Sequence, residues 1–293
     1  MARLTVLGAL AMDRPIRLSG PLAPGARLAG VTLGGALEGR LGGGGANAGV
    51  ALLKAGHDVA IAGVVAADAE GDEVLGLAAS AGLEVSAVGR RPGVTRKTLI
   101  FVDPNGERAV IGLDLDRASL IIPELEAPGP SAALDGLFVR SAYPSAQAWA
   151  QACRGPVMVH LPVIGFPGLA DVAVTSAEDM DAGFLAAPYQ TARRQLGERL
   201  SWVVVTRGAA GAVAYGQTVQ IEAFAPRVEK VVDTTGAGDI FAAGLLDALV
   251  AGAEMEAALR HACAWGAAAV GLDGSAPLEA PPALFPAFRP ASS

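Results

Sequence analysis

Apolar residues along this 293-residue chain follow two patterns that alternate from the N-terminus onward. Short, continuous apolar runs predict buried strands at Leu4–Leu7, Val59–Val65, Leu134–Arg140, Val157–His160, Asp171–Val174, Trp202–Thr206 and Gly211–Tyr215. Runs with helical spacing predict helices at Ala46–Ala55, Asp72–Ala81, Gln190–Glu198, Ile240–Ala251 and Met255–Val270. Such alternation predicts an α/β fold, in which helices cover both faces of a doubly wound, mostly parallel sheet. Ligands then bind beyond the carboxyl ends of the strands.

Two segments depart from this alternation. Residues 15–41 contain many glycines and few regularly spaced apolar positions, and Thr98–Leu113 alternates like a β-hairpin around Pro104-Asn105-Gly106. We therefore expect one large α/β domain with a small β-structured appendage.

Composition narrows the class of protein. Apolar residues make up 52% of the chain, enough for a substantial core. No apolar run approaches the roughly 20 residues needed to cross a bilayer, and no leader-like segment opens the chain, so we expect no membrane partner and a cytoplasmic location. A net charge of −7 argues against nucleic-acid binding, which needs a basic face. Cys153 and Cys263 lie far apart in the sequence, so we expect neither a metal site nor a disulfide.

The segment Asp233–Phe241 carries the most specific chemistry. Gly236, Ala237 and Gly238 lie where a loop becomes the N-terminus of a helix. Backbone N–H groups there lack intrahelical acceptors and lie at the positive end of the helix dipole. Such a turn binds anions, and phosphates above all.

Asp239 falls in the first turn of the same helix. A carboxylate at this position can accept a proton from a hydroxyl while the N–H groups stabilise a transferring phosphoryl group. The alternative is an acidic residue that merely complements the helix dipole. The spacing D-T-T-G-A-G-D-x-F-x-x-G favours the first interpretation.

This string, Asp233 to Gly244, resembles the C-terminal signature of the ribokinase-like (PfkB) sugar kinases. Three further blocks resemble the same family, in family order and spacing. They are Val6–Asp13, a first strand that ends in a sugar-binding Asp; Gly42–Ala48, a Gly-Gly-x-x-x-Asn turn; and Val203–Ala212, a strand and glycine turn at the nucleotide. The resemblance covers nearly the whole chain and implies a ribokinase-like fold, with a β-sheet lid formed by about residues 14–41 and 95–114.

The resemblance also implies roles for individual residues. Asp239 is the general base, and the N–H groups of the turn formed by Gly236, Ala237, Gly238 and Asp239 form the anion hole. Asp13, Gly42, Gly43 and Asn47 bind the sugar, and Thr206, Gly208 and Gly211 bind the nucleotide together with Ser176 and Cys263. From the residues alone, Asn47 could equally cap a helix, Asp13 could end a strand, and Thr206–Gly211 could form a plain turn.

The implied cofactors are ATP and Mg²⁺. In the best register, Asp179 holds Mg²⁺ through water, with Ser176 in place of the family's Asn; Thr175 and Glu178 are the alternative register. Asp233 and Thr235, with a second loop at Gly274-Ser275, correspond to a K⁺ site of many relatives, although Asp233 could simply cap the turn.

Other positions depart from the family pattern. Gly44 replaces a frequent Lys, and Ala66-Ala67-Asp68 replaces Gly-Asp-Asp. Cys263 replaces a small polar residue beside the adenine, and His160 is interpreted as a strand-end residue.

We therefore predict an ATP-dependent kinase that acts on a hydroxyl of a sugar or sugar-like small molecule. The alternatives are a nucleoside kinase of the same family and a catalytically weak descendant that senses sugars or nucleotides. A homodimer through the lid is expected, because unpaired strand edges seek partners.

Overall fold

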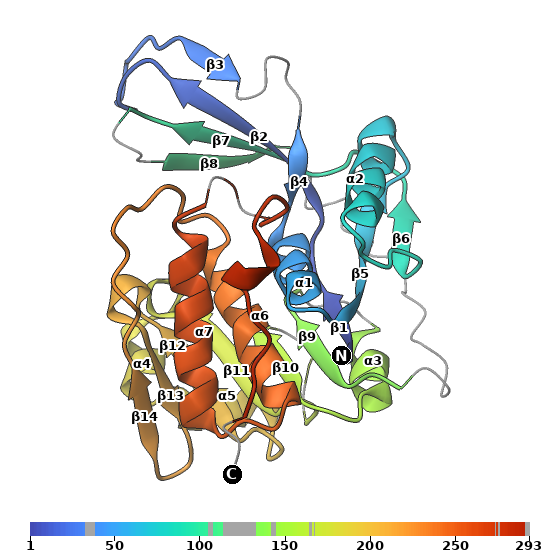
Figure 1. Cartoon of the computed structure of the whole chain (residues 1–293), viewed down its shortest axis with the longest axis vertical. Helices are drawn as coiled ribbons and strands as arrows, with labels where there is room; N and C mark the ends of the chain where they lie inside the picture. The colour runs from blue at the N-terminus through green and yellow to red at the C-terminus, as the bar shows by residue number, and fades with distance from the viewer. Residues whose placement is uncertain are drawn as a thin grey trace.

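The computed structural model describes residues 1–32, 39–104, 108–113, 133–141, 145–163, 166, 168–272, 274 and 276–290. These residues form a large sheet covered by helices and a smaller sheet that projects from one end of the molecule (Figure 1). The predicted α/β architecture is confirmed.

The large sheet has nine strands. Their order is β14 (Gln220–Ala223), β13 (Ala212–Tyr215), β12 (Trp202–Thr206), β11 (Val172–Ser176), β10 (Val157–His160), β9 (Gly136–Val139), β1 (Arg3–Leu7), β5 (Asp58–Ala66) and β6 (Val88–Arg91). The two pairs that involve β13 are antiparallel, and all other neighbouring pairs are parallel. The carboxyl ends of the strands from β12 to β6 therefore share one edge, where ligands of such sheets bind.

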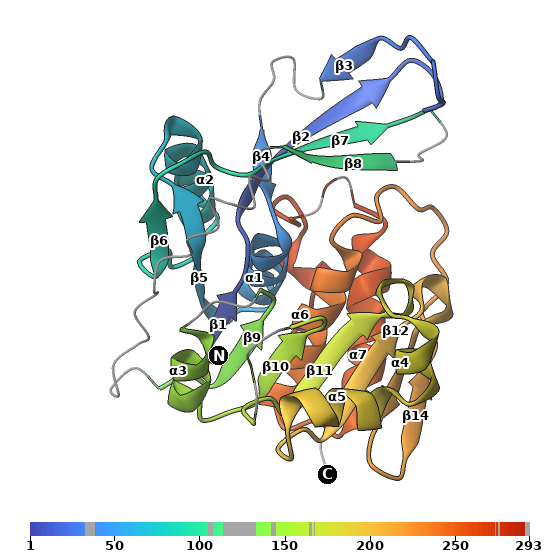
Figure 2. The ribbon, with the colours of Figure 1, turned by 180° about the vertical axis from the view of Figure 1, so that it is seen from behind.

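Helices cover both faces of this sheet (Figures 1 and 2). One face carries α1 (Gly44–Lys54), α2 (Ala69–Ser80), α6 (Ala237–Val250) and α7 (Met255–Ala269), and the other carries α3 (Ala146–Ala152), α4 (Ala182–Ala186) and α5 (Pro188–Leu196). Successive strand residues enter opposite layers: Val6 and Phe138 pack in one core, Leu7 and Val139 in the other. This alternation explains why the strands are continuously apolar.

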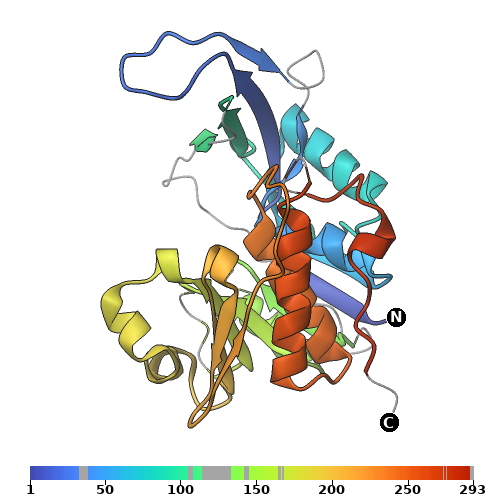
Figure 3. The ribbon, with the colours of Figure 1, turned by 60° about the vertical axis from the view of Figure 1, so that its left-hand side comes forward.

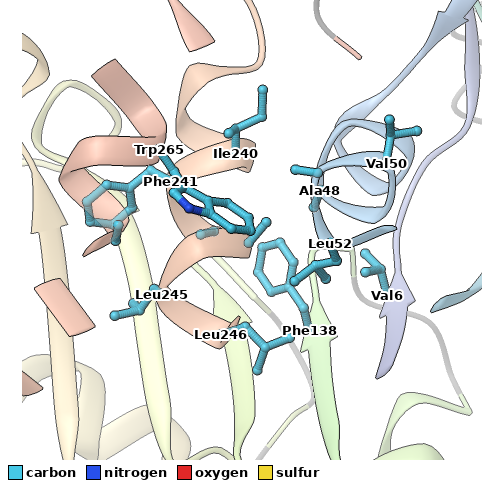
Figure 4. Close-up of a cluster of buried hydrophobic side chains, with 14 of the residues drawn as sticks. Val6, Ala48, Val50, Leu52, Phe138, Ile240, Phe241, Leu245, Leu246 and Trp265 are labelled. Carbon is cyan, nitrogen blue, oxygen red and sulfur yellow. The ribbon is translucent and has the colours of Figure 1, made fainter. Parts of the chain in front are cut away.

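Helix α6 is apolar on nearly every side because it is enclosed by α1, α7 and the sheet. Figure 4 shows Leu246 of α6 beside Phe138 of β9, with Trp265 of α7 nearby. Gly244 is needed for this packing, since a Cβ there would lie 2.9 Å from the Trp265 ring. The buried helix presents its N-terminus to the ligand-binding edge.

The small sheet has five strands. They are β3 (Gly30–Thr32), β2 (Ala11–Leu18), β7 (Lys97–Val102) and β8 (Arg108–Leu113) in that order, with β4 (Arg40–Gly42) also paired to β2. The predicted hairpin corresponds to β7 and β8, which pair antiparallel; its turn residues 105–107 lie outside the described residues. Figure 3 shows this sheet reaching away from the helical layers.

Several boundaries differ from the predicted ones. Helix α6 begins at Ala237, three residues before the predicted Ile240, because Gly236 adopts the left-handed conformation (φ 78°) that turns the chain into the helix. Helix α2 begins at Ala69, since the Asp68 side chain caps it by accepting from the Gly71 N–H at 2.8 Å. The short elements β6, β14, α3 and α4 were not predicted.

Within the described part of the chain, no helix combines the length and hydrophobicity needed to cross a bilayer.

Candidate active site

A cavity of about 240 Å³ lies where the carboxyl edge of the large sheet meets the small sheet. Its lining residues are Ala9, Ala11, Asp13, Gly43, Gly44, Asn47, Arg96, Thr98, Ile100, Val110, Arg140, Ser141, Thr235, Gly236 and Asp239. We call Gly44, Asn47, Arg140 and Asp239 the cavity floor. The cavity roof consists of Thr98, Ile100 and Val110 of the small sheet, with Arg96 directly before β7. The predicted residues Asp13, Gly43, Asn47, Thr235, Gly236 and Asp239 therefore meet in one site.

Asp239 is held from two sides. The Arg140 Nε donates to Asp239 Oδ1 at 2.6 Å, and the Asn47 Nδ2 donates to Asp239 Oδ2 at 2.9 Å. The donors come from the residue that follows β9 and from α1, both distant in sequence from Asp239, and the Asp239 side chain is only 11% exposed. Its orientation is therefore determined by the surrounding protein, not by solvent.

Asn47 has an unsatisfied oxygen. Because a carboxylate only accepts hydrogen bonds, the amide nitrogen of Asn47 must face Asp239. Its Oδ1 then has no partner among the described residues, although the residue is only 4% exposed. A buried acceptor without a donor is costly, and a hydroxyl of a bound molecule would remove that cost. This geometry adds to the predicted role of Asn47, because it also orients Asp239.

Glycines allow the first loop and α1 to approach closely. Gly43 has φ 91°, and a Cβ there would lie 2.5 Å from the Ala9 carbonyl oxygen. A Cβ on Gly42 would lie 2.0 Å from the Asp13 carboxylate, which is itself 4% exposed. Gly42 is absent from the lining; it supports Asp13 from behind.

The turn before α6 has fewer free donors than the sequence predicts. The Ala237 N–H donates to the Thr234 carbonyl at 3.3 Å, so it is engaged within the turn. The N–H groups of Gly238 and Asp239 have no acceptor among the described residues. Free N–H groups at a helix N-terminus are of the kind that bind anions, so these two groups are the candidates at this helix.

The predicted K⁺ residues are occupied by other contacts. Asp233 is 2% exposed; its carboxylate accepts from the Thr235 N–H at 2.7 Å and the Gly274 N–H at 3.2 Å, and the Arg40 Nη2 lies 3.8 Å away. A guanidinium already supplies positive charge here, so these residues fit a potassium ion poorly. Ser275 lies outside the described residues.

The predicted nucleotide residues lie outside the cavity lining. Ser176 and Thr206 are register partners at the carboxyl ends of β11 and β12. Gly208 and Gly211 follow in the turn to β13, and a Cβ on Gly211 would lie 2.1 Å from the Ala223 carbonyl oxygen. Cys263 is 3% exposed and donates to the same carbonyl at 3.7 Å. Burial raises the pKa of the Cys263 thiol to about 11, so it is an unreactive packing group here.

His160, at the end of β10, interacts electrostatically with Arg140 and Asp239 of the cavity floor and with Asp179. Burial and then the positive charge of Arg140 lower its pKa to about 4, while Asp239 and Asp179 act in the opposite direction. His160 is therefore neutral near pH 7 and lies within the field of three site residues.

Asp179 and Glu178 are exposed beside this edge. No group of three or more His, Cys, Asp or Glu side chains in the described part of the chain is arranged to hold a metal ion. Exposed carboxylates nevertheless suit Mg²⁺, which keeps several waters and relies on substrate phosphates for its remaining ligands.

Sequence reasoning missed Arg140. The available signal was a charged residue directly after the buried strand β9, at the ligand-binding edge. A second signal was Gly44, because a Cβ there would lie 2.9 Å from both Arg140 Nε and Asp239 Oδ1. The absence of a side chain at position 44 makes room for this ion pair.

Comparison with known proteins decides the family. A family model for the pfkB carbohydrate kinases matches residues 1–129 and 166–281 of the chain. The chain belongs to this family. It is therefore an ATP-dependent phosphotransferase of the sugar or nucleoside kinase type, and the predicted family, fold and enzyme class are confirmed.

Relatives span most of the chain. A 1-phosphofructokinase of Rhodobacter capsulatus is 29% identical over 78% of this chain and 79% of its own, and a 5-dehydro-2-deoxygluconokinase of Photobacterium profundum is 29% identical over 83% and 82%. A ribokinase of Arabidopsis thaliana, solved with ribose and ATP, has a TM-score of 0.72 at 19% identity and covers 97% of this chain and 98% of its own. A Burkholderia thailandensis nucleoside kinase in complex with inosine has a TM-score of 0.71 at 20% identity, covering 96% and 95%.

Proposed function

We propose that this PfkB-family kinase transfers the γ-phosphoryl group of ATP to a hydroxyl of a small sugar or nucleoside, with Asp239 as the general base. The observation that carries this proposal is the Asp239 carboxylate, held at both oxygens on the cavity floor and adjoining the free amides of the α6 terminus. A base for the hydroxyl and donors for the phosphoryl group thus meet at one point.

Asp13 and Asn47 are the groups that would hold acceptor hydroxyls. Both are buried and line the cavity, and the unpaired Oδ1 of Asn47 is placed to accept a hydrogen bond from a hydroxyl. The structural neighbours solved with ribose and with inosine support both acceptor types. Closure of the cavity roof over a bound acceptor would exclude water, so that the hydroxyl receives the phosphoryl group.

The remaining roles follow from position. The N–H groups of Gly238 and Asp239 stabilise the transferring phosphoryl group. Thr206, Gly208 and Gly211 bind the nucleotide along the edge from β12 to β13, beside Ser176. Asp179 would hold Mg²⁺ through water, and the ion when bound neutralises phosphate charge. Arg40 near Asp233 leads us to expect little dependence of activity on K⁺.

Assembly and location extend the proposal. The edge strands of the small sheet, β3 and β8, expose Val31, Val110 and Ile111. Unpaired edges with apolar side chains favour pairing with a second copy, so we propose a homodimer through this sheet in the cytoplasm.

A coupled assay of ADP release tests the function across a panel of sugars and nucleosides. We expect at least one acceptor to stimulate ADP release well above the rate with water alone. Measurable binding of ligands without stimulated turnover for any acceptor would reject the kinase and favour a descendant that only senses ligands.

A further inference from the structure

The cavity contains more guanidinium groups than its carboxylates use. Arg140 donates to Asp239 through one nitrogen, Nε. A guanidinium has five N–H donors, and the terminal amino groups of Arg140 have no partner among the described residues. The side chain is 32% exposed and lines the cavity, so these donors are accessible to a ligand.

Arg96 contributes a second guanidinium from the opposite side. It directly precedes β7 of the small sheet, where its carbonyl accepts from the Met12 N–H at 3.1 Å. That bond anchors the backbone at the mouth of the cavity. The Arg96 side chain is exposed, lines the cavity, and forms neither an ion pair nor a hydrogen bond with any described residue.

A neutral acceptor offers these groups only hydroxyl oxygens, which accept hydrogen bonds but do not neutralise the positive charge. Its hydroxyls are already matched by Asp13 and Asn47, and closure of the roof over a sugar would remove water from unpaired positive charge, which is costly. A carboxylate or phosphate accepts several parallel N–H bonds in the fork geometry of arginine.

We propose that the acceptor carries an anionic group, a carboxylate or a phosphate, which Arg96 and the terminal nitrogens of Arg140 bind. This inference rests on the proposed kinase function and names the acceptor class as an acidic sugar derivative. Arg96 is the specificity residue, whereas Arg140 both binds the anion and positions Asp239.

Matched pairs of acceptors test the inference. The probes are fructose 1-phosphate against fructose and gluconate against glucitol, each assayed for ADP release and for binding by titration calorimetry. We expect at least one acidic member to have a kcat/KM on the order of 10- to 100-fold above its neutral counterpart, as charge-assisted hydrogen bonds allow. A preference in the fructose pair would identify the anionic group as a phosphate, and a preference in the gluconate pair would identify it as a carboxylate.

Arg96→Gln should reduce this preference at least tenfold through KM for the acidic acceptor, without changing KM for ATP. Arg17→Gln is the matched control, because Arg17 is exposed on β2 of the same sheet and lies outside the cavity lining. The control should keep the full preference for the acidic acceptor.

Two kinetic results and one binding result would overturn the inference. Equal kcat/KM within every pair would leave a kinase of neutral acceptors. A rise in KM for ATP in Arg96→Gln, the same with every acceptor, would assign the guanidinium to the nucleotide phosphates. If no acceptor stimulates ADP release, the kinase itself is wrong. In that case calorimetry still tests the anion-binding site on its own. Equal affinity for the acidic and neutral probes would reject the site. Tighter binding of the acidic probe that is lost in Arg96→Gln would support it.

Discussion

The floor and the roof of the cavity are built in different ways. Asp239 and Asn47 on the floor are buried and hydrogen-bonded to each other, and Gly44 leaves no room for a Cβ beside Asp239. Arg96 and Val110 on the roof are exposed, and Val110 is 57% exposed on an edge strand. The difference leads us to expect that the floor carries out the reaction and holds the acceptor, and that the roof adjusts which acceptor is preferred.

The strongest test of the floor is Asp239→Asn. The amide keeps the size of the side chain but cannot act as a base, so we expect turnover to fall on the order of 10²–10⁴-fold. Steady-state kinetics check this result, with thermal unfolding as the test of folding. Asp72→Asn, in the first turn of α2 and outside the cavity, should keep full turnover. If turnover of Asp239→Asn falls by less than about tenfold, Asp239 is not the general base.

A smaller effect is expected from Gly44→Ala. The new Cβ would lie 2.9 Å from both Arg140 Nε and Asp239 Oδ1, so the ion pair must shift. Misplacement of a catalytic group by about 1 Å can cost on the order of 100-fold, and we expect kcat to fall by about 10- to 100-fold. Gly76→Ala on the exposed side of α2 is the control, since a Cβ there meets nothing within 4 Å. Equal kcat in both variants would show that Arg140 does not position the base.

His160, whose pKa is affected by Arg140 and Asp239 of the floor, leads us to predict a pH dependence of stability. The folded state protonates His160 only near pH 4, whereas the unfolded chain does so near 6.5. The unfolded state therefore binds more protons between these values, and the free energy of unfolding falls as pH decreases from 6.5 towards 4. For this residue the loss from pH 7 to 5 is about 1–2 kcal/mol.

His160→Gln tests this prediction, because the variant has no titrating group at position 160. Urea unfolding at pH 7 and pH 5 should give a smaller loss of stability in the variant than in the parent protein. Identical losses in both proteins would mean that His160 is not buried beside Arg140.

The smallest effect is expected on the roof. Val110→Ala removes apolar contact surface from the cavity wall while leaving the floor unchanged. We expect KM for the acceptor to rise by about 2- to 5-fold with kcat nearly constant, as loss of a small buried area implies. Val31→Ala on the other edge strand, outside the lining, is the control. A fall in kcat without a rise in KM would contradict the division between floor and roof.

The sequence predicts the fold and part of this site for identifiable physical reasons. Buried strands and the α6 turn are local patterns, so apolar runs and the Gly-Ala-Gly-Asp order reveal them directly. Asn47 and Asp239 meet because α1 and α6 both begin at the ligand-binding edge, which the α/β pattern already implies. Asp13 was expected at the end of the first strand, but β1 ends at Leu7 and Asp13 lies in β2 of the small sheet.

Other features depend on contacts that the sequence does not display. The ion pair between Arg140 and Asp239 joins residues 99 positions apart, and the hydrogen bond of Ala237 within its turn depends on local backbone geometry. Arg40 beside Asp233 likewise comes from a distant strand. Single-residue patterns therefore identified candidate groups, but not which of them are already paired.

The most direct measurement of the central claim follows the γ-phosphoryl group itself. ATP labelled at the γ-phosphate is incubated with an active acceptor and either the parent protein or Asp239→Asn, and the label is traced. We predict that label appears on the acceptor with the parent protein and is nearly absent from it with the variant. Label released as inorganic phosphate by the parent protein, or acceptor labelling that persists in the variant, would contradict the account.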